Sequence, residues 1–105
     1  MVISPPSVTL TLLRTGAVEL ARRYFASWLG GAEAEELATP PVWSALLRTS
    51  EGLILFDTGL HPVHVRRPDA TFGPQSGIRV VMSDEDAVLA RLAALGVRPE
   101  EVTVV

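Results

Sequence analysis

At 105 residues the chain has the size of one domain, and its 48% hydrophobic and 20% charged residues are typical of a globular protein and exclude a disordered tail. The net charge is −3, and the nine Lys and Arg residues form no basic stripe, so we expect no nucleic-acid partner. Cysteine is missing from the sequence, which excludes disulfides, thiol catalysis and thiolate metal sites.

The two ends of the sequence differ in character. Residues 1–8 carry neither the basic segment nor the apolar core of a signal peptide, and no apolar run reaches the roughly 18 residues that a membrane span needs. We therefore expect a cytoplasmic protein without a membrane partner. Residues 102–105 form an apolar, β-branched run at the other end, which predicts a chain cut in mid-strand.

The first forty residues predict a strand followed by less regular structure. Residues 8–12 alternate polar and apolar, which is the period of a half-buried strand. Thr15 and Gly16 are typical turn residues, and residues 17–28 then fit either a helix or a returning hairpin strand; the hairpin is our preferred interpretation. Residues 30–41 predict a loop that contains one helical turn.

A hairpin is predicted next. Residues 42–48 and 53–57 are apolar runs joined by a four-residue connection that contains Gly52. The second run is apolar on both faces, so we expect this strand to be central in its sheet and covered on both sides. Residues 60–79 follow with little periodicity, and a loop of this length is usually functional or mobile.

A helix is predicted at residues 83–95. Ser83 and Asp86 have the spacing of a capping box, and Gly96 is expected just past the helix end. The predicted apolar stripe consists of Val88, Leu89, Leu92 and Leu95. Residues 102–105 predict a strand parallel to residues 53–57, because a helical crossover separates the two. These elements predict an incomplete α/β domain: a mixed β-sheet with one covering helix.

Two short motifs are candidates for a functional site. Asp57, Thr58 and Gly59 end a buried strand, and strand ends form the ligand edge of open α/β sheets. The same residues are typical of a turn, and from these three residues alone the turn is our preferred interpretation. His61 and His64 are spaced as two metal ligands, but zinc needs three or four, so solvent-exposed loop histidines are the preferred interpretation. The residues alone give no catalytic, cofactor-binding or metal-binding set.

Three segments in register resemble one protein family. PPVWSALLRTSEGLILFDTGL (40–60) resembles the opening hairpin of metallo-β-lactamase-fold hydrolases, above all the N-acyl-homoserine lactonase group. VTLTLLRTG (8–16) resembles the group's first strand, and SDEDAVLARLAALGVRPEEVTVV (83–105) its acid-capped helix and next strand. The resemblance implies an αββα sandwich, of which residues 1–105 form the N-terminal half as one incomplete domain.

The resemblance also implies a chemistry. In this family an H-x-H-x-D-H motif follows the strand that corresponds to residues 102–105 and helps to bind two zinc ions, whose bridging hydroxide attacks a lactone or another ester-like substrate. We therefore expect these 105 residues to be inactive alone, without a cofactor of their own. Asp57 matches a family residue that supports the loop of metal ligands through hydrogen bonds. The loop at 60–79 is expected near the substrate entrance.

Other interpretations stay open. The chain fits a small non-catalytic binding or assembly module that recruits a partner through an open sheet edge. A zinc-binding loop built on His61 and His64 ranks last. If the chain is half a fold, the sheet face that carries Leu46, Leu53 and Leu55 is expected to lack its covering layer. Wet leucines forfeit about 1.5–3 kcal/mol each, so we expect marginal stability and self-association.

Overall fold

The structure is a computed structural model and describes residues 7–105. Its strands are β1 (Thr9–Ala21), β2 (Leu37–Ala38), β3 (Pro41–Thr49), β4 (Gly52–Phe56), β5 (Arg79–Val81) and β6 (Val102–Val104). Its α-helices are α1 (Gly31–Glu35) and α2 (Val88–Ala94), and short 3-10 turns lie at Arg22–Tyr24, Pro62–Val65, Asp84–Asp86 and Pro99–Glu101. The prediction that no signal peptide is present concerns residues 1–8, most of which lie outside the described part.

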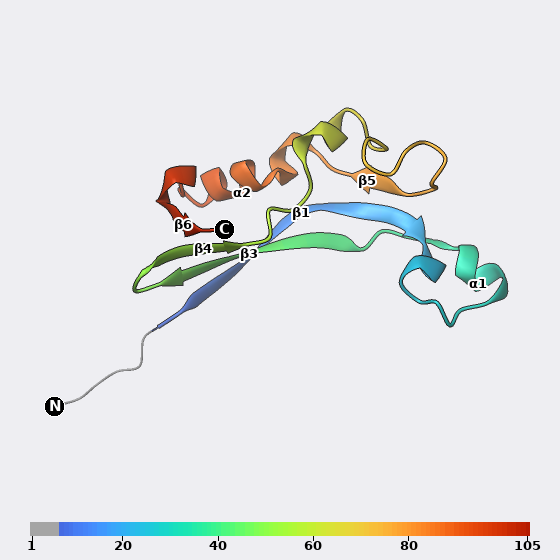
Figure 1. Cartoon of the computed structure of the whole chain (residues 1–105), viewed down its shortest axis with the longest axis horizontal. Helices are drawn as coiled ribbons and strands as arrows, with labels where there is room; N and C mark the ends of the chain where they lie inside the picture. The colour runs from blue at the N-terminus through green and yellow to red at the C-terminus, as the bar shows by residue number, and fades with distance from the viewer. Residues whose placement is uncertain (1–6) are drawn as a thin grey trace.

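The strands form one mixed sheet in the order β2-β1-β3-β4-β6, and β5 pairs with the second half of β1. All pairs are antiparallel except β4 with β6, which are parallel as predicted. α2 lies over the part of the sheet that β6, β4 and β3 form, whereas α1 lies at the far end of the long β1–β3 ribbon (Figure 1). The predicted helical turn within residues 30–41 is confirmed as α1. Within residues 7–105, no helix has the length and apolar character needed to span a membrane.

The turn predicted at Thr15 and Gly16 is wrong, because β1 runs straight through both residues. Its pairing with β3 shifts register between Arg14 and Ala17, which is the mark of a β-bulge. Gly16 has φ +114°, and a Cβ there would lie 3.0 Å from the carbonyl oxygen of Val81 in β5. The glycine therefore serves a bulge and a close approach of two strands, and residues 17–21 continue β1 rather than returning as a hairpin.

The hairpin of β3 and β4 is confirmed, and β4 has the predicted central place between β3 and β6. The prediction that β4 is covered on both faces is wrong. Leu53 and Leu55 are 5% and 4% exposed, but Phe56, which points to the opposite face, is 71% exposed. The reason is that α2 packs on one face only, while both faces of the strand are apolar.

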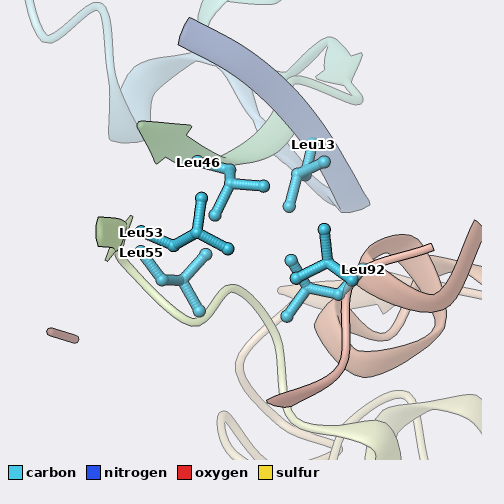
Figure 2. Packing of buried hydrophobic residues seen from close by; sticks show 6 residues of the cluster. Leu13, Leu46, Leu53, Leu55 and Leu92 are labelled. Carbon is cyan, nitrogen blue, oxygen red and sulfur yellow. The ribbon is translucent and has the colours of Figure 1, made fainter. Parts of the chain in front are cut away.

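The hydrophobic core lies between the sheet and α2. In Figure 2 the side chains of Leu13, Leu46, Leu53 and Leu55 point from the sheet toward Leu92 of the helix. Each of these leucines is less than one-tenth exposed. The prediction that the face with Leu46, Leu53 and Leu55 lacks its covering layer is therefore wrong, because the helix of the same chain covers that face.

The helix predicted at residues 83–95 is in fact two elements. Asp84–Asp86 form a 3-10 turn, Ala87 is extended (φ −55°, ψ 139°), and α2 begins only at Val88. The backbone N–H of Ser83 donates to Asp86 Oδ2 at 2.8 Å, so the predicted capping interaction exists but caps the 3-10 turn. Of the predicted apolar stripe, Leu92 is 1% exposed, whereas Leu89 and Leu95 are 58% and 49% exposed.

The end of α2 is a Schellman motif with Gly96 at the predicted place. The N–H of Gly96 (φ +74°) donates to the carbonyl of Ala93, and the N–H of Val97 donates to the carbonyl of Leu92, both at 2.9 Å. Val97 and Leu92 are both buried in the core cluster. The chain therefore reverses direction over Gly96 while remaining packed on the sheet, and this reversal aims it into β6.

Candidate functional site

The candidate site lies where β4 ends. Asp57 has φ +68° and is the one non-glycine residue with positive φ in residues 7–105. Its Oδ1 accepts a hydrogen bond from the N–H of Gly59 at 2.8 Å. Aspartate tolerates the left-handed region because its side chain can bond its own backbone in this way. Asp57 thus forms the turn that these residues predict, and its side chain is exposed.

Two buried hydroxyl groups fix this turn to the sheet. Ser44, 1% exposed on β3, donates from its Oγ toward the carbonyl oxygens of Phe56 (3.1 Å) and Asp57. Thr15, fully buried beside the bulge of β1, donates to the carbonyl of Val42 at 3.2 Å and packs against Gly59. Sequence reasoning missed both residues, because a single hydroxyl within an apolar strand is their only signal.

The turn at Asp57 shares its edge of the sheet with the end of β6. Because β4 and β6 are parallel and adjacent, both strands deliver the chain to the same side of the sheet. A cavity of about 260 Å³ adjoins the turn and is largely apolar; its walls come from residues 58–62 and from Ala87, Val88 and Leu89 at the start of α2. Ligands of open α/β sheets bind at this kind of edge.

The two histidines of the loop have different environments. His61 is exposed as predicted, and its Nδ1 accepts the N–H of Val63 at 3.0 Å. His64 is 4% exposed, so its predicted exposure is wrong. The turn at Pro62–Val65 folds its ring inward, with Nδ1 2.8 Å from the carbonyl oxygen of His61 and Nε2 2.6 Å from Thr71 Oγ1.

The partners of His64 define its role. A carbonyl oxygen can only accept, so Nδ1 carries the hydrogen, and in the neutral ring Nε2 accepts from the hydroxyl of Thr71. Both ring nitrogens are therefore engaged inside the protein, and His64 fastens two parts of the 60–79 loop together. This arrangement speaks against a zinc-binding loop on His61 and His64.

The described residues do not form a binding site for a metal ion. Between residues 7 and 105, no three His, Cys, Asp or Glu side chains lie close enough together to hold one. The site near Asp57 thus offers a turn, a carboxylate and an apolar cavity, and this part of the chain supplies no set of metal ligands.

No protein-family model and no curated protein matches the chain, whereas solved structures do. An N-acyl homoserine lactone hydrolase with the product N-hexanoyl-L-homoserine at its catalytic metal centre matches with a TM-score of 0.77 and 28% identity, over 90% of this chain. A mutant of B. thuringiensis AiiA with N-decanoyl-L-homoserine at its active site gives the same values. The chain has the fold of part of a metallo-β-lactamase-fold lactonase.

The chain also matches the structure of an enzyme from a study of how mutations contribute indirectly to the optimisation of a new enzyme function. The TM-score is 0.79 and the identity is 27% over 94% of this chain. The chain spans 38–39% of the length of these three proteins. The predicted mixed sheet of a partial metallo-β-lactamase fold is therefore confirmed. The activity, substrates and metal content of the longer proteins belong to those proteins.

Proposed function

We propose that this chain is the first part of a cytoplasmic, metal-dependent hydrolase that opens the ring of N-acyl-homoserine lactones. The observation that carries the proposal is the match over 90% of the chain, at 28% identity, to a hydrolase of that substrate class with its product bound at a catalytic metal centre. In such a hydrolase, two zinc ions, held by residues that the described chain does not supply, would provide the nucleophile.

In the proposed reaction, the role of this chain is to support the metal site. Asp57 Oδ1 is engaged by Gly59, while no hydrogen-bond partner of Oδ2 is found in residues 7–105. The carboxylate is exposed, beside the strand end to which β6 also delivers the chain. An oxygen in this place can accept a hydrogen bond from a metal-ligating side chain and fix its orientation, an interaction worth about 10–100-fold in metal affinity or activity.

A hybrid enzyme tests the proposal. Residues 1–105 are joined, at the strand that corresponds to β6, to the remaining part of the matched homoserine lactone hydrolase, and hydrolysis of N-hexanoyl-L-homoserine lactone is measured with zinc present. We expect the hybrid to open the lactone and the 105-residue chain alone to be inactive. A folded hybrid that binds zinc and hydrolyses no lactone would contradict the proposed function.

Asp57→Asn separates the two roles of Asp57. Asparagine tolerates positive φ and keeps an oxygen for the N–H of Gly59, so the turn is preserved and only the charge is lost. We expect the hybrid with Asp57→Asn to lose about 10-fold or more in kcat or zinc affinity while its unfolding midpoint stays unchanged. Glu33→Gln, which removes an exposed charge on α1, is the control and is expected to change neither.

A further inference from the structure

Ser44 lies directly beside the turn at Asp57. The register of β3 and β4 pairs Ala45 with Phe56, so Ser44 stands opposite Asp57, one position past this pair. Its side chain is buried on the same sheet face as Leu46, which is the face that α2 covers. Its Oγ donates toward the carbonyl oxygens of both Phe56, at 3.1 Å, and Asp57. One buried hydroxyl thus serves two successive carbonyl groups.

The two carbonyl groups reach one donor because Asp57 leaves the strand conformation. Along an extended strand, successive carbonyl groups point in opposite directions, so a single side chain meets one of them. Asp57 has φ +68°, in the left-handed helical region, and successive carbonyl groups of a helical backbone point the same way. The hydroxyl of Ser44 therefore favours the left-handed conformation of Asp57, since an extended Asp57 would offer this hydroxyl a single acceptor.

The left-handed conformation decides where the carboxylate of Asp57 lies. Leu55 of β4 is buried beneath α2 and Phe56 points to the opposite face, so continued alternation would turn Asp57 toward the buried face. A carboxylate in that place would lose its hydration. The turn instead leaves the side chain exposed, with Oδ1 bound to the N–H of Gly59, while the smaller side chain of Ser44 occupies the buried side.

We propose that Ser44 is a positioning residue: it holds Asp57 in the left-handed conformation and so fixes the carboxylate at the edge where β4 and β6 end. Within residues 7–105, no other side chain donates to the carbonyl groups of Phe56 and Asp57. The inference goes beyond the proposed function in giving Ser44 a role. Its effect on lactone hydrolysis rests on that function, whereas its effect on the backbone of Asp57 does not.

Nuclear magnetic resonance of the 105-residue chain tests the backbone step without substrate. Positive φ brings the N–H of a residue close to its own Hα, so the nuclear Overhauser effect between these two hydrogens of Asp57 is strong in the unchanged protein. We expect the effect to weaken in Ser44→Ala, which removes the donor. We expect it to weaken less in Ser44→Cys, because a thiol of similar size is a weak donor.

Thr49→Val is the matched control, because the Oγ1 of Thr49 donates to the carbonyl of Gly52 at 3.1 Å at the other end of β3. Far-UV circular dichroism verifies folding, and Ser44→Cys carries the comparison if Ser44→Ala does not fold. An unchanged Overhauser effect of Asp57 in the folded Ser44 variants would overturn the proposal. An equal change of this effect in Thr49→Val would overturn it too.

The hybrid enzyme described above tests the functional step through a double-mutant cycle. We expect Ser44→Ala to lower kcat for the lactone about 10-fold, and Thr49→Val to change it less than about 2-fold. Because Ser44 acts through the carboxylate of Asp57, adding Ser44→Ala to Asp57→Asn is expected to lower kcat by less than about 2-fold further. A further loss of about 10-fold would show that Ser44 acts by another route and would overturn the proposal. An inactive unchanged hybrid would contradict the proposed function instead, and the Overhauser effect of Asp57 would still decide the role of Ser44.

Discussion

Thr15 packs directly against the backbone of Gly59. A Cβ at Gly59 would lie 2.7 Å from Cγ2 of Thr15 and nearer still to its Oγ1, although Thr15 comes from the bulge of β1 and Gly59 from the turn after β4. Thr15 is fully buried, and Gly59 has φ +70°. The candidate site is therefore held against the first strand by a contact that only a residue without a side chain permits.

Gly59→Ala is expected to destabilise the protein more than the same change at Gly77. Both glycines have positive φ (+70° and +73°), so alanine adds backbone strain of about 1 kcal/mol or more at each. Nothing lies within 4 Å of a Cβ at Gly77, whereas at Gly59 overpacking against Thr15 adds about 1–3 kcal/mol. Urea unfolding at one protein concentration measures both variants, and equal losses of unfolding free energy would show that Thr15 gives way.

Thr71→Val is expected to lower the unfolding free energy by about 1–3 kcal/mol, because it leaves Nε2 of the buried His64 without its hydrogen-bond donor. Thr58→Val removes an exposed hydroxyl from a neighbouring turn and is expected to cost less than about 0.5 kcal/mol. Chemical denaturation compares the two. If Thr71→Val is as mild as its control, His64 does not fasten the loop.

Leu92→Ala is expected to cost about 2–5 kcal/mol, because Leu92 is 1% exposed in the centre of the core. Leu89→Ala is expected to cost less than about 1 kcal/mol, since Leu89 is 58% exposed on the same helix. The two substitutions are chemically identical, and the sequence pattern predicts that both leucines belong to the apolar stripe of the helix. A comparison of the two thermal unfolding midpoints therefore shows which side of α2 faces the sheet.

Asp86 is expected to make the unfolding free energy depend on pH. Burial raises the pKa of its carboxyl, but hydrogen bonds from Ser83 and Arg91 outweigh burial and hold the pKa below its usual value of 3.8. The Arg91 Nη2 lies 2.6 Å from Asp86 Oδ1. A lowered folded-state pKa contributes stability that is complete above about pH 5 and is lost as the pH falls below 3.8 through the lowered pKa.

Asp86→Asn is therefore expected to lower the unfolding free energy at pH 7 and to lose less than the unchanged protein between pH 5 and pH 3. Asp84→Asn removes the same charge from the same 3-10 turn without removing the hydrogen bonds to Ser83 or Arg91, so it serves as control. Urea unfolding at several pH values gives the comparison. Parallel pH curves for Asp86→Asn and the unchanged protein would contradict the assignment.

The elements that the sequence predicts correctly have local causes. The β3–β4 hairpin follows from two apolar runs joined through Gly52, and the end of α2 follows from Gly96. The sequence predicts a turn at Gly16 where the structure has a bulge, because the cause of the bulge is distant: Val81 of β5 pairs beside it on β1. A glycine has the same local signature in a turn and in a bulge, and only the pairing of far segments distinguishes the two.

The start of α2 and the choice of the buried sheet face also depend on distant residues, so local sequence patterns do not predict them. Ala87 favours helix by itself, yet it is extended where Arg91, one turn into α2, reaches back to Asp86 and donates to the carbonyl of Arg14 in β1 at 2.7 Å. Alternation along β4 separates its two faces correctly, but both are apolar, so no local signal says which one α2 covers. The inward ring of His64 likewise depends on Thr71, a partner that spacing alone does not reveal.

The long first strand has a consequence for biosynthesis. β1 pairs with β3, with β2 and with β5, whose last residue is Val81. At about 5–20 residues per second, a ribosome that has completed β1 needs several more seconds before β5 emerges. During that interval residues 17–19 of β1, which pair with β5 in the finished sheet, form an unpaired strand edge, a target for chaperones as well as for aggregation. Such distant pairings also make folding slow compared with helical proteins of equal length.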